Sequence, residues 1–364
     1  MPDNDYENKP PYYDIEIDIL KNADTFKPQE ELLNLLRILR PDWNVEKLKF
    51  KIFTNGITNK IFRVSCDPFQ DRLVFRVFGH GSSKIINRVQ ELENFDKLSR
   101  WGIGAPVICR FRNGIVCGYL EGECVDVDTV RQANMVEKIA AALAKMHKIP
   151  PKTKSAEFTP FMYSKISNYF EVIPEKYTES NKQETYDEYF KNNGIDLKTD
   201  FCELQQKLDM LDEDSRRIVF CHNDLLIYNI LYDPKTDEIH FIDYEYAADN
   251  FQLFDIANHF CEYAGVTDPD YSLCPDETHK RMFLTKYLHR FHNGSEEAPG
   301  VEAVDKLLAD IPIFEAASHL FWSIWALAQS HLSVIDFDYL KYAIIRHKEY
   351  IKIIRPSCRN IPTE

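Results

Sequence analysis

The feature that most constrains this chain is a polar loop that lies between apolar segments past the middle of the sequence. The apolar segment 218–220 precedes the loop, which reads HNDLLIYN and places Asp224 and Asn229 in the order D-x-x-x-x-N. A turn and a second apolar segment follow, and Asp243 ends that segment. The pattern predicts a strand, a functional loop, a hairpin and a strand.

These polar residues are the types that phosphoryl transfer requires. The reaction depends on placing an acceptor hydroxyl and on neutralising phosphate charge with Mg²⁺. We expect Asp224 to be an exposed loop acid that orients the hydroxyl and takes its proton, and His222 to support the loop. Asn229 and Asp243 offer the hard oxygen ligands that Mg²⁺ prefers. A lone H-x-D is usually a turn, but its flanking strands and the second acid favour a kinase-type catalytic loop.

Upstream, residues 47–64 predict a place for the phosphates of a nucleotide. They read as two strands on either side of an Asn-Gly pair, which suits a tight hairpin. The chain has no G-x-G-x-x-G, so we expect Gly56, Thr58 and Asn59 to offer backbone N–H groups and side-chain donors instead. The alternative is a structural hairpin that holds no ligand.

A charged residue lies inside the next apolar segment, residues 73–79. Arg76 would be costly there without an anionic partner, and its guanidinium could hold phosphate oxygens in pairs. Protein kinases place a lysine at the corresponding point. The predicted helix 88–98 carries Glu91 and Glu93, and by analogy with kinases one of them should pair with Arg76, whereas the other would face solvent.

The remainder of the chain predicts a hinge and a mainly helical part. The apolar segment 115–120 resembles the connection between kinase lobes, where main-chain groups of Gly118 and Leu120 would contact adenine. Residues 135–147 predict a helix that opens the helical part. The polar stretch 150–194 is the least constrained region, and we expect it to include a mobile insertion.

Three motifs together resemble the choline/ethanolamine kinase family: GITNKIF, HNDLLIYN and FIDYEYAADNFQLFDIANHFCEYAGV. The resemblance implies an α+β, bilobal, protein-kinase-like fold with a small, mainly antiparallel-sheet N-lobe and a larger, mostly helical C-lobe. We expect an acidic, partly ordered leader over 1–28, a nucleotide-binding N-lobe over 29–120, and a C-lobe over 121–364. The family also implies ATP and Mg²⁺ as cofactors, and it favours Glu91 as the partner of Arg76.

The resemblance also assigns an amino-alcohol pocket. Trp322 and Trp325 are three residues apart on a predicted helix, a spacing that usually means core packing. In related kinases the matching residues line the pocket, and an ammonium is attracted to both aromatic faces and carboxylates. The pocket residues that the resemblance implies, besides Asp224, are Tyr246, Glu262, Trp322, Trp325 and Tyr342.

Within the family, GITNK and HFCEYAGV look more like ethanolamine kinases than choline kinases. A primary ammonium must satisfy three hydrogen-bond donors, whereas a quaternary ammonium has none. Glu262 and Asp255 are the expected acceptors, and the small Ala264-Gly265 pair removes aromatic bulk from one wall. The sequence therefore predicts ATP-dependent phosphorylation of ethanolamine to phosphoethanolamine, the first step of phosphatidylethanolamine synthesis as the resemblance implies. A choline or dual kinase, an aminoglycoside-type phosphotransferase and a non-catalytic binding module remain alternatives.

Composition limits the classes of partner and the cellular compartment that we expect for this protein. A net charge of −14 argues against nucleic acid as a partner. The nine cysteines are scattered without a C-x-x-C pair, which indicates reduced thiols. The apolar run 320–328 is too short to span a bilayer, and the amino-terminal residues lack a signal-peptide pattern. We expect a cytoplasmic enzyme of small-molecule metabolism without stable membrane insertion, and the sequence allows a homodimer.

Overall fold

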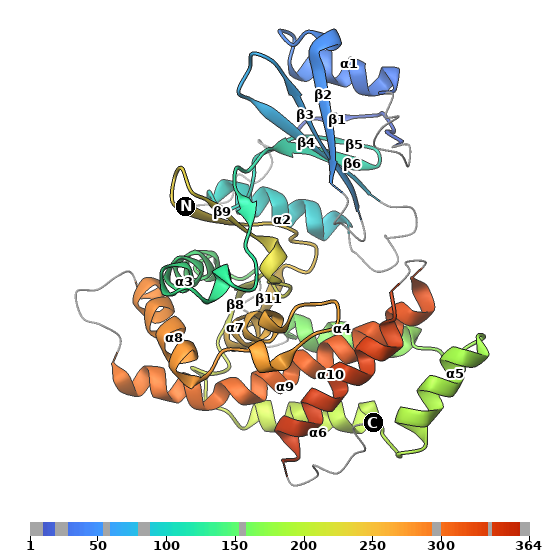
Figure 1. Cartoon of the computed structure of the whole chain (residues 1–364), viewed down its shortest axis with the longest axis vertical. Coiled ribbons are helices and arrows are strands. Elements are labelled where there is room, and N and C mark those ends of the chain that lie inside the picture. Colours follow the sequence, from blue (N-terminus) through green and yellow to red (C-terminus); the bar gives the residue numbers. More distant parts are fainter. Residues whose placement is uncertain are drawn as a thin grey trace. The chain divides into compact units, whose positions relative to one another are not determined.

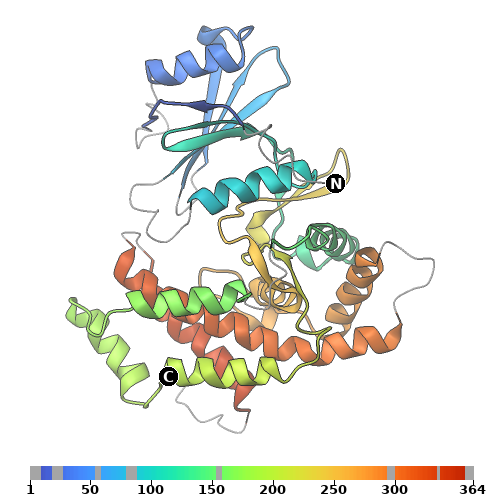
Figure 2. The same ribbon diagram turned by 180° about the vertical axis from the view of Figure 1, so that it is seen from behind.

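In the computed structural model, the chain forms two compact units (Figures 1 and 2). The first unit comprises residues 1–123 and 240–245, and the second comprises residues 124–239 and 246–364. The structure describes residues 10–18, 28–53, 59–78, 88–152, 158–292, 300–333 and 337–356, and for residues 59, 88 and 89 the backbone only.

The first unit contains a six-stranded sheet with the strand order β1-β5-β6-β4-β3-β2. All neighbours in it are antiparallel except β1 and β5, which are parallel. Alternating apolar residues give the sheet a buried face, on which Phe62 stacks on Phe75 with ring centroids 4.9 Å apart. The elements of this unit are β1 (Tyr12–Tyr13), α1 (Glu30–Leu39), β2 (Leu48–Phe53), β3 (Asn59–Cys66), β4 (Arg72–Phe78), α2 (Arg88–Arg100), β5 (Val107–Phe111) and β6 (Gly114–Gly118).

The second unit is mostly helical, and α9 forms its centre. This helix packs against α10, α7, α4, α8 and α6, and Figure 1 shows α10 lying along it. The helices are α3 (Ala133–His147), α4 (Phe161–Val172), α5 (Ser180–Tyr186), the π-helix η5 (Asp187–Lys191), α6 (Leu197–Asp209), α7 (Gln252–Cys261), α8 (Glu277–Phe291), α9 (Val301–Leu332) and α10 (Tyr339–Ile354).

Short strands carry the loops of interest. Strands β8 (Ile218–Cys221) and β11 (Ala248–Phe251) form an antiparallel pair. Strands β9 (Ile230–Asp233) and β10 (Glu238–Phe241) form a three-stranded sheet with β7 (Glu123–Cys124), in the order β10-β9-β7. The predicted order of strand, loop, hairpin and strand is confirmed, and so is the protein-kinase-like fold class.

The described residues of the leader and of the stretch 150–194 form defined structure. In the leader, β1 pairs with β5 and Ile17 is 1% exposed in the core of the first unit. Between residues 150 and 194, the described part forms α4, α5 and η5 rather than a loose insertion, because aromatic side chains anchor it. Tyr189 is buried there, and its hydroxyl lies 3.1 Å from Nδ1 of His347.

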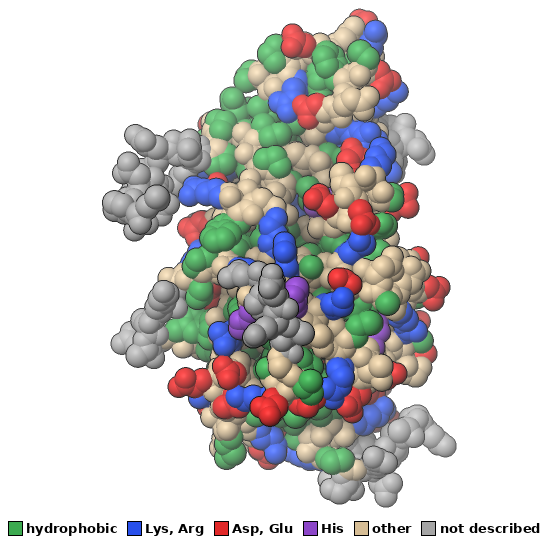
Figure 3. Space-filling model, turned by 90° about the vertical axis from the view of Figure 1, so that its left-hand side faces the viewer, with side chains coloured by type: hydrophobic (Ala, Val, Ile, Leu, Met, Phe, Trp, Pro, Cys, Tyr) green, Lys and Arg blue, Asp and Glu red, His purple; other side chains and the backbone are tan. Residues whose placement is uncertain are grey.

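Helix α9 is also longer than the apolar run 320–328 suggested. Among the described residues it is the one helix that is long and apolar enough to cross a membrane, but 78% of its apolar window is buried inside the protein. On the face shown in Figure 3, acidic and basic side chains are interspersed. The negative net charge is therefore not gathered on that face.

Candidate active site

The first unit contains a buried guanidinium held between two carboxylates. Arg76 on β4 is 5% exposed, and its Nη2 lies 3.3 Å from Oε1 of Glu91 on α2 and 3.0 Å from Oδ1 of Asp243. Its carbon Cζ lies 5.0 Å from the ring centroid of Phe95. Burial alone would lower the pKa of Arg76, but Asp243 and Glu91 outweigh it and the pKa is raised. The predicted pair with Glu91 is confirmed, and Asp243 is a further partner.

Asp243 lies two residues beyond β10 and has the backbone angle φ of 65°. This left-handed conformation is tolerated by Asp better than by most residues, and it occurs often at functional sites. The side chain is 31% exposed, and its recorded contact with Arg76 uses Oδ1. A hard oxygen on a partly exposed carboxylate fits a Mg²⁺ ligand.

In the second unit, the loop after β8 is tied to helix α7 through one carboxylate. The N–H groups of His222 and Asn223 donate to Oδ2 and Oδ1 of Asp255, each at 2.7 Å. Asn223 has φ of 65°, and its Nδ2 donates to the carbonyl oxygen of Tyr246 at 3.0 Å. The expectation that Asp255 accepts a substrate ammonium is therefore wrong, because both of its oxygens hold the loop backbone.

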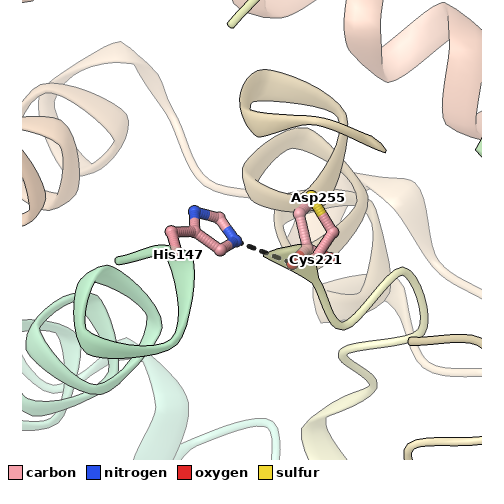
Figure 4. Close-up of side chains that lie close together, drawn as sticks. All are labelled: His147, Cys221 and Asp255. Atoms are coloured by element: carbon pink, nitrogen blue, oxygen red, sulfur yellow. Dashed lines mark hydrogen bonds and ion pairs between the residues drawn. The ribbon is translucent and has the colours of Figure 1, made fainter. Parts of the chain in front are cut away.

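The same carboxylate binds a histidine, as Figure 4 shows. Nε2 of His147 lies 2.9 Å from Oδ2 of Asp255, and Nδ1 lies 2.6 Å from the hydroxyl of Tyr287. Ligand atoms of His147, Asp255 and Cys221 lie within 4.8 Å of one another. However, burial raises the pKa of Cys221 well above its usual value, and both ring nitrogens of His147 have partners. The arrangement suits a structural anchor better than a metal site.

Two hydrogen bonds between residues of the loop hold it in a defined conformation. The N–H of Asp224 donates to Nδ1 of His222 at 3.3 Å, and Nδ2 of Asn229 donates to the carbonyl oxygen of Asp224 at 2.9 Å. The second bond leaves Oδ1 of Asn229 as an oxygen that can coordinate a metal. Asp224 is 8% exposed, so our expectation of an exposed loop acid is wrong.

A row of aromatic rings in the second unit brings together residues of helices α9 and α10 and of the loops that precede β11 and α10. Trp322 contacts both Tyr246, at 5.6 Å between centroids, and Trp325, at 5.2 Å. Nε1 of Trp325 donates to the hydroxyl of Tyr246 at 2.9 Å. The row continues through further ring contacts, and its members in order are Tyr246, Trp322, Trp325, Tyr339, Phe337 and Tyr342.

A buried carboxylate lies beside the end of this row. Glu262 is 2% exposed, and its Oε1 accepts from Nη1 of Arg346 at 3.0 Å. The same nitrogen lies 3.4 Å from the hydroxyl of Tyr342. Burial raises the pKa of Tyr342, Arg346 opposes that rise, and the negative charges of Glu262 and Asp224 add to it. The loop acid Asp224 and the predicted pocket residues Glu262 and Tyr342 thus belong to one unit.

The predicted nucleotide residues have different outcomes. Gly56 and Thr58 lie outside the described residues, and for Asn59 only the backbone is described, at the start of β3. The N–H of Gly118 donates to the carbonyl oxygen of Pro106 at 2.9 Å, so it is not open to an adenine. Leu120 is half-buried just after β6. The roles of these residues towards a nucleotide stay predictions.

Sequence reasoning missed several residues of the second unit. Asn258 on α7 accepts from Nε1 of Trp322 at 2.7 Å and from the hydroxyl of Ser318 at 2.8 Å. Arg346 was missed because it follows Tyr342 on a helix with no motif. A charged residue on the apolar face of a predicted helix was the one available signal, since it needs a buried partner.

The fold and these residues define a phosphotransferase of the protein-kinase-like class. A family model described as choline/ethanolamine kinase matches residues 50–351, and the chain belongs to that family. It is 36% identical to ethanolamine kinase 2 of Homo sapiens over 88% of this chain and 80% of that protein. It is 33% identical to ethanolamine kinase 1 of Mus musculus over 90% of this chain and 92% of that protein. A solved structure of a Plasmodium vivax ethanolamine kinase has a TM-score of 0.75 at 26% identity and covers 90% of both chains.

Proposed function

We propose that this enzyme transfers the γ-phosphoryl group of ATP to the hydroxyl of ethanolamine and releases phosphoethanolamine and ADP. The observation that carries the choice of acceptor is Oε2 of Glu262, a buried carboxylate oxygen with no hydrogen-bond partner among the described residues. A primary ammonium can donate to such an oxygen, and a quaternary ammonium cannot. The similarity to proteins named ethanolamine kinases supports the same acceptor.

The roles of the polar loop residues follow from their chemistry. Asp224 would accept a hydrogen bond from the acceptor hydroxyl, place its oxygen for attack and take up the proton. Asn229 in the second unit and Asp243 in the first each offer an oxygen that fits Mg²⁺. When bound, Mg²⁺ would neutralise charge on the transferring phosphoryl group. Arg76 would hold phosphate oxygens, with Glu91 and Asp243 fixing its orientation.

The aromatic row supports a second candidate, a choline or dual kinase. Tryptophan and tyrosine faces attract quaternary ammonium groups without needing N–H donors. Four of the predicted pocket residues lie in that row, which could surround a trimethylammonium. The two candidates share the same mechanism and differ only in the acceptor. A cytoplasmic location and a homodimer stay predictions.

The test is ADP release from Mg·ATP in the presence of ethanolamine, choline or no amine. We expect kcat/KM for ethanolamine to exceed that for choline about tenfold or more, a difference of about 1.4 kcal/mol. A preference for choline would keep the mechanism and replace the acceptor. No stimulation by either amine would reject the proposal in favour of an aminoglycoside-type enzyme or a non-catalytic relative.

A matched pair of variants identifies the catalytic acid. We expect Asp224→Asn to lower kcat by several orders of magnitude, because the hydroxyl loses its proton acceptor. Asp237→Asn is the control, since Asp237 lies in the β9–β10 turn with φ of 61° and its side chain is 62% exposed. Retention of more than about a tenth of the activity by Asp224→Asn would remove the role assigned to Asp224.

A further inference from the structure

Arg346 on α10 is a buried charged residue without an assigned role. It is 1% exposed and lies among three polar groups from three elements. Nη1 contacts Glu262 at 3.0 Å and Tyr342 at 3.4 Å, and Nη2 donates to the hydroxyl of Ser318 on α9 at 2.8 Å. Lysine could not make this set of bonds, because only a guanidinium presents several donors in a fixed plane.

The contacts of Arg346 leave one carboxylate oxygen in a defined place. Oε1 of Glu262 is occupied by Arg346, whereas Oε2 is buried and has no hydrogen-bond partner among the described residues. A buried carboxylate oxygen without a donor is costly, so its retention suggests that a ligand supplies the donor. The hydroxyl of Tyr342, which is held by the same guanidinium, ends the aromatic row on this side.

We propose that Arg346 is a positioning residue for amine selectivity: by fixing Glu262 through Oε1, it presents Oε2 to the N–H donors of a primary ammonium. This inference rests on the proposed function, and it adds a residue that contacts Glu262 rather than the substrate. A protonated ethanolamine has three N–H donors for Oε2, and choline has none. Loss of Arg346 should therefore weaken the binding of ethanolamine more than the binding of choline.

Arg346 also favours the charged form of the Glu262 carboxylate. Burial raises the pKa of Glu262, and Arg346 opposes that rise. The tyrosines, the cysteines and the histidine around the pair do not change charge near neutral pH. Burial raises the pKa values of these tyrosines and cysteines, and it holds the pKa of His319 well below its usual value. Those neighbours are Tyr271, Tyr342, Cys261, Cys274 and His319. Two acids also lie nearby: Glu315, which pairs with Lys280, and Asp224, in the loop beyond Tyr342.

The experiment compares Arg346→Lys, which keeps the charge but not the planar fork, with Arg346→Met, which removes both. For Arg346→Lys we expect KM for ethanolamine to rise about tenfold, with kcat and KM for ATP within about twofold, and the preference over choline to fall by the same factor. In Arg346→Met, the acidic limb of the pH profile of kcat/KM for ethanolamine should also move to higher pH. In Arg346→Lys, that limb should stay at its wild-type pH, because the positive charge is kept. Lys341→Met is the control, because it removes an exposed charge from the same helix.

Folded Arg346→Lys and Arg346→Met enzymes with wild-type preference and KM would overturn the inference. Should Arg346→Met fail to fold, Arg346→Lys decides alone. Should both fail, Ser318→Ala decides, because it removes the Nη2 partner and leaves every charge in place. We expect it to raise KM for ethanolamine severalfold, and an unchanged KM would then reject the role of Arg346.

A binding measurement separates this inference from the proposed function. Ethanolamine and choline are titrated against wild-type and Arg346→Lys protein without ATP, and tryptophan fluorescence is followed. Selective binding of ethanolamine that Arg346→Lys weakens, without ADP release by the wild-type protein, would support the role of Arg346 and reject the proposed reaction. Absence of ethanolamine binding to the wild-type protein would reject both.

Discussion

The guanidinium of Arg76 shows why an arginine can stand where protein kinases place a lysine. One nitrogen contacts Glu91 on α2 and Asp243 beyond β10, and the ring of Phe95 lies against the group. A planar group with several donors can serve both carboxylates and still direct further donors elsewhere. An ammonium is a more compact charge on a flexible chain and would favour one of the two.

We therefore expect Arg76→Lys to raise KM for ATP about tenfold and to lower the melting temperature, because a buried carboxylate loses a partner. Enzyme kinetics at varied ATP and a thermal melt measure the two effects. Arg72→Lys is the matched control on the same strand, since Arg72 pairs with Glu121 and its side chain is 30% exposed. Equal effects of the two variants would contradict the special role of Arg76.

The side chain of Asp255 accepts several of the hydrogen bonds that hold the loop after β8. We expect Asp255→Asn to cost about 3–5 kcal/mol of stability and to lower kcat, because an amide cannot accept from His222, Asn223 and His147 together. Urea unfolding and initial rates measure these effects. The pKa of Asp255 is lowered, so its contribution is present above its unfolded pKa and is lost as pH falls through the lower folded value. A stability difference that persists unchanged at pH 2 would contradict this account.

At the scale of elements, the strands and helices were predictable where the pattern is periodic or the turn chemistry is clear. The helix at residues 135–147 and the strand around Arg76 follow from apolar spacing, and the need of Arg76 for an anionic partner follows from the cost of a buried charge. The choice of Glu91 as that partner came from the family resemblance. The burial of Asp224, the anchoring role of Asp255 and the contacts of Arg346 depend on residues distant in sequence. No local pattern encodes those contacts, so they could not be predicted.

The described part of the leader belongs to the core of the first unit, a placement that no local pattern indicates. We expected a partly ordered leader, and its Ile17 is buried with Leu32, Leu35 and Leu36 of α1 in the first unit. The N–H of Ile17 donates to Oδ1 of Asn113 at 3.0 Å, and Nδ2 of Asn113 donates back to its carbonyl oxygen at 2.8 Å. Residues 10–18 are thus part of the sheet unit.

We expect Ile17→Ala to destabilise the first unit by about 2–4 kcal/mol, since truncating a fully buried aliphatic side chain leaves a cavity. Tyr12→Ala is the control, because the Tyr12 side chain lies in the same leader and Tyr12 is 57% exposed. Hydrogen exchange of the amides in β5 and β6 would locate the loss. Similar unfolding midpoints for both variants would show that the leader contributes little.

At the scale of the whole molecule, stability should depend on neutral buried histidines. Burial lowers the pKa of His259 to about 4 and that of His319 well below its usual value. An unfolded histidine has a pKa of about 6.5. The unfolded chain therefore binds more protons than the folded protein once the pH falls below that value, and the free energy of unfolding decreases.

We expect His259 alone to remove about 2 kcal/mol of stability between pH 7 and pH 5. Melting temperatures of the wild-type protein should fall over this range, and those of His259→Gln should fall less. A parallel decrease in the two proteins would contradict the assignment. Protonation of His259 would also disturb the loop after β8, because Nδ1 of His259 lies 3.2 Å from the carbonyl oxygen of Leu225 in that loop.

One amide, that of Asn258, links the catalytic loop to the aromatic row. Its Oδ1 accepts from Trp322 and Ser318, and its Nδ2 lies 3.4 Å from the carbonyl oxygen of Asn223. Changes at Trp322 would therefore disturb the alignment of the loop as well as the fit of the acceptor. Acceptor range should change more freely at Phe337, because its described ring contacts are with Tyr339 and Tyr342 and not with the loop after β8.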